Sequence, residues 1–380
     1  MILYKARRKG SAPVVTNKTL TIKLNLSQSD PSLWGEYMDD AIGMTAGSAD
    51  FDTFFGHYPC ILQEGGTELG KLNPNNYAQY EDGTSAPITT VGNDVMVYFP
   101  RRGLKIWKDS GYLYVSITNE EGKTGYDYYA FTYKGSACDG FYRGAYKGYM
   151  ANNKLNSVSG QTPTASQAIG AFRSNAQAKG TNYEQSAFYQ LTYLQAMYLI
   201  KYKGANAQIA VGRGFVDGNS AVYGATGYTN DKGMDWGEST GKYPMKLFGM
   251  EDFFGNIYEF IDGIYSNASR QLWVADGNFN DTGSGYTPLG TASFSSNIGG
   301  YLKDVNGTTQ SGFTPASQSY GTDSTYFCDG AYVSDSRLAA FGGFWNYASA
   351  AGVFLLIVNL AASTSAAAYS ARLMYFKLSA

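Results

Sequence analysis

The sequence predicts an α+β protein, with a β-rich first third followed by a larger domain in which helices precede strands. Three observations lead to this class. The composition is rich in Tyr (33 residues) and Gly (46), which is typical of many short strands joined by glycine turns. Apolar residues alternate with polar ones in the first third, whereas they recur at helical spacing in the middle of the chain. Only 16% of the residues are charged, against the usual quarter or so, which favours a large buried or apolar surface.

The first third contains several expected strands. Residues 20–26 and 112–117 alternate apolar and polar side chains, the pattern of half-buried strands. Residues 95–99 and 103–107 form two more, and Pro100-Arg101-Arg102 between them predicts a hairpin connection. The glycines around 122–125 mark the best boundary, so we expect a β-rich domain over residues 1–124 and a second domain over 125–380.

Two helices are expected next, over residues 164–179 and 183–202, because apolar residues recur there three and four positions apart. Gly180 would cap the first of them. Residues 212–241, rich in Gly and Asn, predict a long ordered loop. Strand alternation returns over residues 257–262, after a turn at Gly255-Asn256.

Charge and hydropathy exclude two classes of partner. The formal net charge of −2 provides no basic stripe for nucleic acid. The longest apolar run, 351–358, stops at Asn359, far short of the ~20 residues that a membrane span needs. Residues 1–15, MILYKARRKGSAPVV, place charge where a signal peptide has its apolar stretch, so no secretory signal is expected.

The residues that usually support catalysis are scarce. The chain has a single histidine, His57, and no P-loop, G-x-S-x-G or dinucleotide-binding motif. Its cysteines, Cys60, Cys138 and Cys328, are far apart and odd in number, which predicts neither a disulfide framework nor a zinc site. We therefore expect no catalytic residue and no cofactor.

Two acidic segments resemble functional sites. Residues 276–281 resemble the start of a calcium loop, but Asp281 occupies the position of the glycine and Thr287 that of the bidentate glutamate, so an Asx-rich turn without a metal is expected. The pairs Glu251/Asp252 and Glu259/Asp262 could flank a glycosidic bond, although turn and strand-surface positions explain them more simply.

One stretch resembles the formylglycine-generating enzyme superfamily, which is built on a C-type lectin fold. In KLFGMEDFFGNIYEFIDG, residues 246–263, the positions that match its G-x-x-D-x-x-G-N-V-W-E-W segment are Gly249, Asp252, Gly255, Asn256, Tyr258, Glu259 and Phe260. The resemblance implies a C-type lectin fold for residues 125–380. The enzymatic activity is not implied, because those enzymes use a cysteine pair and Cys328 stands alone here.

The end of the chain resembles the variable region of retroelement-diversified proteins, a family that includes phage tropism determinants. Its pattern G-G-x-W-x-x-x-S-x-A-G-x-F, followed by a hypervariable stretch and a final Arg, is matched by Gly342, Gly343, Trp345, Ser349, Ala351, Gly352, Phe354 and Arg372. Residues 188–214 also resemble tail-associated proteins of phages that infect Gram-positive bacteria. The resemblance implies a variable region over residues 342–372.

In that family, adenines of template Asn codons are mutagenised, which gives access to Phe, Tyr, Ala, Leu, Ile and Thr. Laying such a template along the segment gives the expected variable, ligand-binding positions, all of which carry Asn or a residue in this set: Phe344, Asn346, Tyr347, Ala350, Leu355, Ile357, Asn359, Leu360, Thr364, Ala366 and Ala368. The expected scaffold residues are Trp345, Gly352, Phe354 and Arg372.

Residues 353–358 permit two interpretations, a plain core strand or one side of a binding face. Val353, Phe354, Leu356 and Val358 are expected to pack inward. Leu355 and Ile357 alternate with them and should point outward. We expect Phe344, Tyr347, Leu355, Ile357 and Leu360 to form exposed apolar anchors for a ligand.

Together these features predict a phage tail receptor-binding protein, located in the virion tail, that recognises a host cell-surface protein or glycan. We expect a homo-oligomer, most simply a trimer, whose subunits meet and attach through residues 1–124, because linked copies raise avidity. One alternative is a bacterial surface protein diversified in the same way. The other is a tail-borne glycan hydrolase that uses Glu259 or Asp262.

Overall fold

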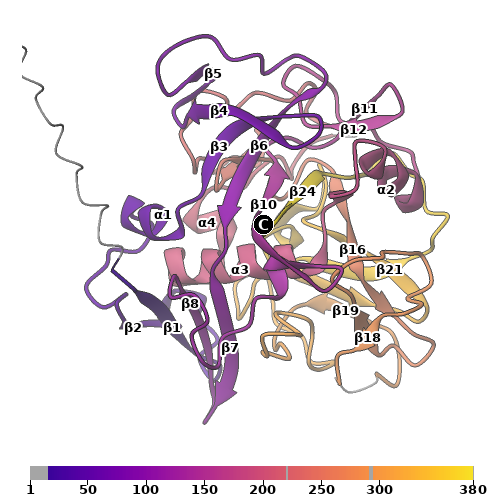
Figure 1. Cartoon of the computed structure of the whole chain (residues 1–380). Coiled ribbons are helices and arrows are strands. Elements are labelled where there is room, and N and C mark those ends of the chain that lie inside the picture. Colours follow the sequence, from indigo (N-terminus) through magenta and orange to yellow (C-terminus); the bar gives the residue numbers. More distant parts are fainter. Residues whose placement is uncertain (1–15, 220, 291–293, 380) are drawn as a thin grey trace, which may run out of the picture.

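The computed structural model describes residues 16–219, 221–290 and 294–379; residues 1–15, to which the prediction on a secretory signal applies, lie outside this range. The described chain is mostly β-sheet, with few helices (Figure 1). Its α-helices are α1 (Ala49–Phe55), α2 (Ile169–Gln177), α3 (Phe188–Tyr202) and α4 (Ala207–Ala210), and its single-turn 3₁₀ helices are η1 (Pro31–Leu33), η2 (Tyr129–Phe131) and η3 (Ala348–Ala350). The β-rich character is confirmed, but one long helix and three short ones give less helix than an α+β protein implies.

The first sheet has four antiparallel strands in the order β2-β1-β8-β7. They are β1 (Thr19–Asn25), β2 (Gly35–Asp39), β7 (Gly103–Asp109) and β8 (Tyr112–Thr118). The alternation seen in the sequence is confirmed, since Leu20, Ile22 and Leu24 of β1 are buried in the core.

The second sheet has the order β13-β24-β10-β6-β3-β4-β5, and β9 pairs with β10. Its strands are β3 (Tyr58–Gln63), β4 (Thr67–Asn73), β5 (Asn76–Tyr80), β6 (Asn93–Pro100), β9 (Thr132–Tyr133), β10 (Ser136–Gly144), β13 (Tyr183–Gln185) and β24 (Leu373–Leu378). Strands from both sides of residue 124 are therefore hydrogen-bonded to one another, and the expected boundary does not separate the sheets.

The hairpin predicted at Pro100-Arg101-Arg102 is wrong. β6 pairs with β3 and β10, whereas β7 pairs with β8, so this short connection carries the chain from the second sheet to the first. The Arg101 guanidinium fixes the crossing, with Nη1 donating to the Phe131 carbonyl (3.0 Å) and Nε to Glu121 (2.9 Å). The sequence shows that strands end here but not which sheet each joins.

The third sheet contains most of the C-terminal part of the chain, in the order β18-β17-β16-β21-β22-β20-β19, with β23 parallel to β16. Its strands are β16 (Tyr258–Ser266), β17 (Leu272–Val274), β18 (Thr287–Pro288), β19 (Ile298–Tyr301), β20 (Gly330–Val333), β21 (Arg337–Phe341), β22 (Leu356–Leu360) and β23 (Tyr369–Ser370). Two small ribbons pair β11 (Tyr149–Ala151) with β12 (Lys154–Asn156) and β14 (Lys246–Leu247) with β15 (Met250–Glu251).

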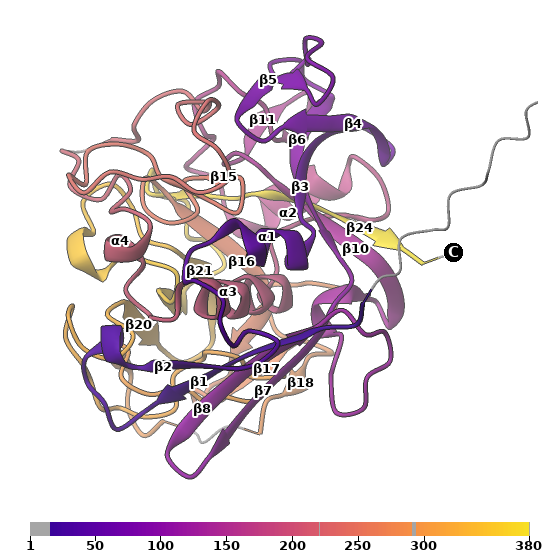
Figure 2. The same cartoon turned by 90° about the vertical axis from the view of Figure 1, so that its left-hand side faces the viewer.

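Helix α3 lies at the centre of the molecule, between the first sheet and the third (Figures 1 and 2). Every residue from Phe188 to Lys201 is buried, so no face of this helix is open to solvent. Its buried amides are satisfied: Gln190 donates to the Ala130 carbonyl and Gln195 to the Val353 carbonyl, each at 2.8 Å. No helix of the described residues is long and apolar enough to cross a bilayer.

Both expected helices exist but begin later than predicted. Ser166 adopts a left-handed conformation (φ 58°), which α-helices of L-residues avoid, so α2 starts only at Ile169. The helix expected from residue 183 starts at Phe188, because Tyr183–Gln185 pairs with β24 instead. Tertiary strand pairing thus overrides the local helical spacing.

Candidate ligand-binding face

Strand β22 divides its side chains between two cores, as the alternation predicts. Val353 and Phe354, just before the strand, and Leu356 and Val358 within it pack into the main core around α3. Leu355, Ile357 and Leu360 belong to a separate apolar cluster on the opposite side of the sheet. The backbone alternation expected for this segment is confirmed.

The expected exposure of that opposite side is wrong. Leu355, Ile357 and Leu360 are only 0%, 3% and 6% exposed, so none of them is available as a surface anchor. The cause is the loop before β22, whose Phe344 and Tyr347 fold over the sheet and pack against the same cluster. Sequence periodicity shows the direction of a side chain but not what covers it.

The covering layer consists of five aromatic residues, here called the tyrosine face: Tyr258, Tyr332, Phe344, Tyr347 and Tyr369. Tyr258 is its buried centre and lies against Tyr369 (ring centroids 5.2 Å apart), Phe344 (5.4 Å) and Tyr347 (5.5 Å). The other four are half-buried, so each presents part of its ring to solvent. Large rings with polar tips are well suited to contact a ligand at low entropic cost.

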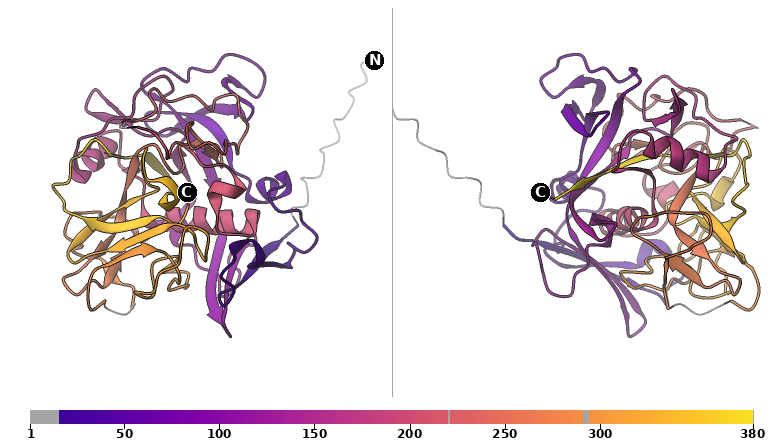
Figure 3. Two further views of the ribbon diagram at one scale, coloured as in Figure 1. Left: turned by 180° about the vertical axis from the view of Figure 1, so that it is seen from behind. Right: turned by 45° about the vertical axis from the view of Figure 1, so that its right-hand side comes forward.

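The register of the third sheet places this face directly. Phe260, Ala340, Ile357 and Tyr332 are cross-strand neighbours on β16, β21, β22 and β20. Tyr369 of β23 pairs beside Tyr258 of β16. The yellow C-terminal segments that carry the face lie together on one side of the molecule, as the view from behind shows (Figure 3).

The tyrosine face is electrically neutral. Burial raises the pKa of Tyr258, Tyr347 and Tyr369, and neighbouring phenols raise that of Tyr258 further, so these hydroxyls stay protonated at neutral pH. The chain between Arg337 and Arg372 adds no charged side chain. The face therefore offers aromatic surface and hydrogen-bonding groups rather than charge.

The main chain of residues 342–354 is held by groups outside this segment. Trp345 N–H donates to the Asn256 carbonyl (3.0 Å) and Ala348 N–H to the Val216 carbonyl (3.0 Å). Gln208 donates to the carbonyls of Ala348 and Ala351, both at 2.8 Å. These bonds fix the backbone without using the side chains of the expected variable positions.

Asp329 makes a further attachment to this segment. Its Oδ2 accepts the Phe354 N–H at 2.7 Å, and a Cβ on Gly352 would lie only 2.1 Å from Oδ1. Burial raises the pKa of Asp329 well above its usual range. The expected scaffold role of Gly352 therefore has a steric basis, because any side chain there would collide with this buried carboxyl group.

Arg372 is fully buried and joins an internal ion cluster around Glu259. Its Nε lies 2.9 Å from Glu259, its other nitrogens donate to the carbonyls of Gly144, Glu251 and Asp252, and Arg143 and Lys147 also contact the Glu259 carboxylate. Arg372, predicted as a scaffold residue, thus meets Glu259 of the 246–263 segment in one buried cluster.

The carboxylates considered for glycan hydrolysis are all buried: Glu251 and Asp252 at 2%, Glu259 at 0% and Asp262 at 1% exposure. Asp262 is paired with Arg173 and hydrogen-bonded by Gln185 (2.7 Å). The expectation that these are surface residues of turn and strand is wrong. In this conformation none of them can reach a polysaccharide.

The remaining expected variable positions lie around the tyrosine face. Asn346 and Ala366 are exposed, while Ala350, Asn359, Thr364 and Ala368 are half-buried. Asn359 carries a buried Oδ1 that has no hydrogen-bond partner among the described residues. The main chain of the loop between β22 and β23 is fixed by two hydrogen bonds. Tyr258 N–H donates to the Ala368 carbonyl (2.9 Å), and Ser166 N–H donates to the Ala366 carbonyl (3.3 Å).

Sequence reasoning missed two aromatic groups. Tyr258, Tyr332 and Tyr369 come from strands outside or at the edge of the expected positions. A second group lies in the loop predicted at 212–241 and just beyond it, with neighbouring ring centroids 5.2–6.2 Å apart: Phe215, Tyr223, Tyr228, Trp236 and Tyr243. This loop contacts the candidate face through Gly218 N–H and the Trp345 carbonyl. The only feature of the sequence that could have indicated this second group is the density of aromatic residues in the loop.

Other candidates have structural roles. His57 is buried and stacked on Phe99 (5.5 Å), and desolvation lowers its pKa to about 4, so it is uncharged at neutral pH. Cys60, Cys138 and Cys328 are buried free thiols. Asn280 accepts hydrogen bonds from the backbone of Thr282 and Ser284, which confirms the Asx-rich turn, and Asp281 pairs with Arg173 (2.7 Å). No group of three or more His, Cys, Asp or Glu in the described part of the chain is placed to hold a metal.

Comparisons with known proteins add a distant likeness. No protein-family model and no curated protein match the chain. Among solved structures it is similar to the "Major Tropism Determinant U1 Variant" and "M1 Variant", each at 14% identity and TM-score 0.32, over 88% of this chain and 74% of that chain. It is also similar to PvdO from Pseudomonas aeruginosa, at 12% identity and TM-score 0.31, over 77% of this chain and 100% of that chain. At these TM-scores the likeness establishes no shared activity.

Proposed function

We propose that the protein is a receptor-binding protein that recognises its ligand through the tyrosine face and the exposed side chains beside it. The observation that carries this proposal is that residues 342–368 are held mainly through their main chain, which leaves exposed side chains free to contact a ligand. The main chain there is fixed by Asn256, Gln208, Asp329 and Tyr258. Phe344 and Tyr347 cover the apolar cluster, but exposed side chains such as Asn346 and Ala366 are not needed to hold the fold. A surface of this kind tolerates exchange of its side chains.

The proposal includes a C-type lectin fold and diversification by a retroelement. The position of Arg372 and Glu259 in one buried cluster supports the fold assignment, because both residues were identified from motifs of that fold class. Among the eleven expected variable positions, we propose that the eight outside the buried set are the ones whose exchange changes the ligand: Phe344, Asn346, Tyr347, Ala350, Asn359, Thr364, Ala366 and Ala368.

The partner is proposed to be a host cell-surface protein or glycan, met at the virion tail by a homotrimer. Three linked faces would compensate for weak individual contacts, since multivalency raises avidity by about 10²–10⁴-fold. We propose no enzymatic step and no cofactor in this recognition. The alternative is a bacterial surface protein that carries the same face, in place of a protein of the virion tail.

Placing arginine at Asn346 and Ala366 should reduce binding of the labelled protein to receptive bacterial cells at least about tenfold, because each new charge must be desolvated against a neutral face. Flow cytometry on a panel of cells measures the effect. Ala268→Arg with Ser269→Arg, on an exposed turn elsewhere, is the matched control. Unchanged binding, or equal loss in both pairs with melting temperatures preserved, would contradict the proposal.

The genomic DNA tests the retroelement separately. We expect a near-copy of the codons for residues 342–372 close to a reverse transcriptase gene. It should carry extra adenines at those of the eight positions that do not already encode Asn: Phe344, Tyr347, Ala350, Thr364, Ala366 and Ala368. A genome without such a copy would remove the diversification from the proposal, while the binding face would stand on its own test.

A further inference from the structure

A buried carboxyl group without a counter-ion lies beneath the loop before β22. Asp329, directly before β20, is 2% exposed, and no lysine, arginine or histidine of the described residues forms an ion pair with it. An unpaired charge loses its hydration in such a site, and one hydrogen bond from an N–H group does not replace that hydration. Burial therefore raises the pKa of Asp329 well above its usual range and favours the neutral carboxyl group.

The titratable groups beside Asp329 provide no positive charge. The Tyr198 phenol of α3 and the adjacent Cys328 thiol are both buried, and burial raises the pKa of each. On the Cys328 side lie two exposed acids, Asp30 and Asp323, whose negative charges oppose the formation of a further one. Among the described residues, an ionised Asp329 would thus find no group that stabilises its charge.

Asp329 holds the same part of the loop as a residue that cannot titrate. Its Oδ2 accepts the Phe354 N–H (2.7 Å), while Gln195 of α3 donates to the neighbouring Val353 carbonyl (2.8 Å). The Phe354 ring also packs edge-on against Phe327 (ring centroids 5.1 Å apart). Of these three attachments, the bond from Asp329 is the one that a proton can change.

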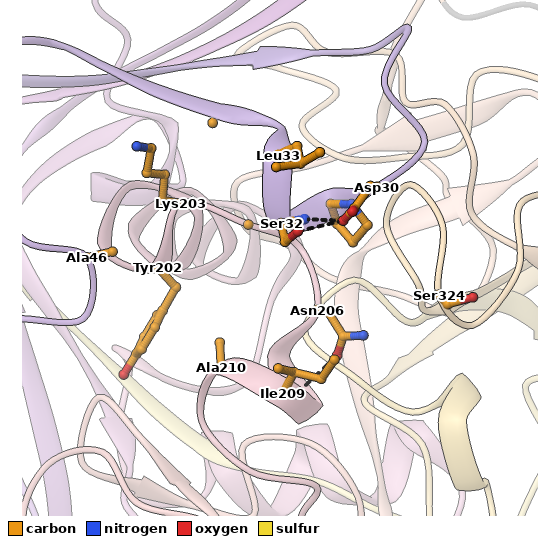
Figure 4. A pocket seen from close by; sticks show the side chains of 13 residues that line it. Asp30, Ser32, Leu33, Ala46, Tyr202, Lys203, Asn206, Ile209, Ala210 and Ser324 are labelled. Atoms are coloured by element: carbon orange, nitrogen blue, oxygen red, sulfur yellow. Dashed lines mark hydrogen bonds between the residues drawn. The ribbon is translucent and has the colours of Figure 1, made fainter.

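The chain that leads into Asp329 is strained and borders an open hollow. Tyr326 and Cys328 have φ values of 58° and 62°, a left-handed conformation that residues other than glycine adopt only where their surroundings hold it. The hollow has a volume of about 650 Å³, and Asn206 and Ser324 line it on one side (Figure 4). The Asn206 side chain lies beside the Cys328 thiol. Solvent can therefore reach this segment from the hollow once the loop before β22 moves away.

We propose that Asp329 is a proton-dependent positioning residue of the tyrosine face: its neutral carboxyl group holds residues 352–354 in place, and loss of the proton releases this loop. An ionised carboxylate regains its hydration only in the open loop, so each opening event is linked to the release of one proton. The consequence for ligand binding rests on the proposed function, whereas the opening of the loop is measurable without a ligand.

Labelling of the native Cys328 measures the opening. This thiol is buried beside Asp329, so a small reagent such as dithiodipyridine reaches it only when the segment opens. Asp329→Asn keeps the size of the side chain and an acceptor oxygen for the Phe354 N–H, but it cannot ionise. The labelling rate of the wild type relative to this variant should rise about tenfold per pH unit between about pH 5 and pH 7, the slope for release of one proton. A ratio that stays constant over this range would overturn the proposal.

Three comparisons make this result specific. Cys60 and Cys138 are buried in the second sheet, so Cys328 should be labelled at least about tenfold faster than either; equal rates would show global unfolding instead of local opening and would overturn the proposal. Asp323→Asn removes an exposed acid near the same thiol and should keep the wild-type slope, whereas loss of the slope would show that Asp329 is not the titrating group. If Asp329→Asn does not fold, the wild-type rate divided by that of free cysteine should give the same slope.

Cell binding then tests the link to the ligand. The apparent affinity of the wild type for receptive cells should fall in proportion to the fraction of closed loop that labelling reports, while that of Asp329→Asn stays constant with pH. Opening of the loop without this loss of affinity would overturn the link. Absence of binding in both proteins, with the labelling slope present, would count against the proposed function and leave the role of Asp329 in the loop supported.

Discussion

Replacing Glu259 by glutamine is expected to lower the free energy of unfolding by about 3–5 kcal/mol at neutral pH. Glu259 is completely buried, and its carboxylate is contacted by Arg143, Lys147 and Arg372, which are themselves buried. Glutamine keeps the shape but leaves these cations without a counter-charge in a medium of low polarity. Urea denaturation at pH 7 measures the loss.

Glu36→Gln is the matched control. Glu36 is 71% exposed at its side chain and lies 3.5 Å from Lys23, so its loss should change the free energy of unfolding by less than about 1 kcal/mol. A small effect at Glu259, similar to that at Glu36, would show that the cluster does not depend on this charge.

The effect of Glu259→Gln should also depend on pH. Burial alone would raise the pKa of Glu259, but the charges of Arg143, Lys147 and Arg372 outweigh burial and hold the pKa well below its usual range. A carboxylate with a depressed pKa contributes stability that is present above the unfolded-state pKa of about 4.3 and is lost as the pH falls through the folded-state pKa. The difference in the free energy of unfolding between wild type and variant should therefore begin to narrow as the pH falls below about 4.3, and continue to narrow down to the much lower folded-state pKa.

Local patterns in the sequence predict individual strands well. Leu20, Ile22 and Leu24 face the core as their alternation requires, and Leu356 and Val358 do the same in β22. The patterns fail where pairing with a strand far along the chain determines the conformation of a segment. Tyr183–Gln185 has helical spacing but pairs with β24, nearly two hundred positions later in the chain, and β6 leaves the expected hairpin to pair with β10.

The candidate site shows the same limit. Motifs placed Trp345, Gly352, Phe354 and Arg372 in the scaffold, and all four are buried. The pattern could not show that Phe344 and Tyr347 fold back over Leu355 and Ile357, because coverage of a sheet face depends on the path of a loop. For the same reason the contribution of Tyr258 and Tyr332, which come from other strands, could not be predicted.

Replacing Trp345 by alanine is the second change expected to have a large effect, with a loss of about 3–5 kcal/mol in the free energy of unfolding. Trp345 is 8% exposed, packs edge-on against Phe344 (ring centroids 5.2 Å apart) and lies where the main chain is bonded to Asn256. Its removal would leave a large cavity beneath the loop that carries the tyrosine face. Thermal and urea denaturation measure the loss.

The neighbouring Asn346 provides the control for this prediction. It is exposed and forms no side-chain hydrogen bond among the described residues, so Asn346→Ala should change the free energy of unfolding by no more than about 0.5 kcal/mol. The two residues are adjacent, so a difference between them reports on side-chain packing rather than on position in the loop. Similar losses at both would mean that scaffold and variable positions are not separated along this segment, and the structural basis for exchanging its side chains would be lost.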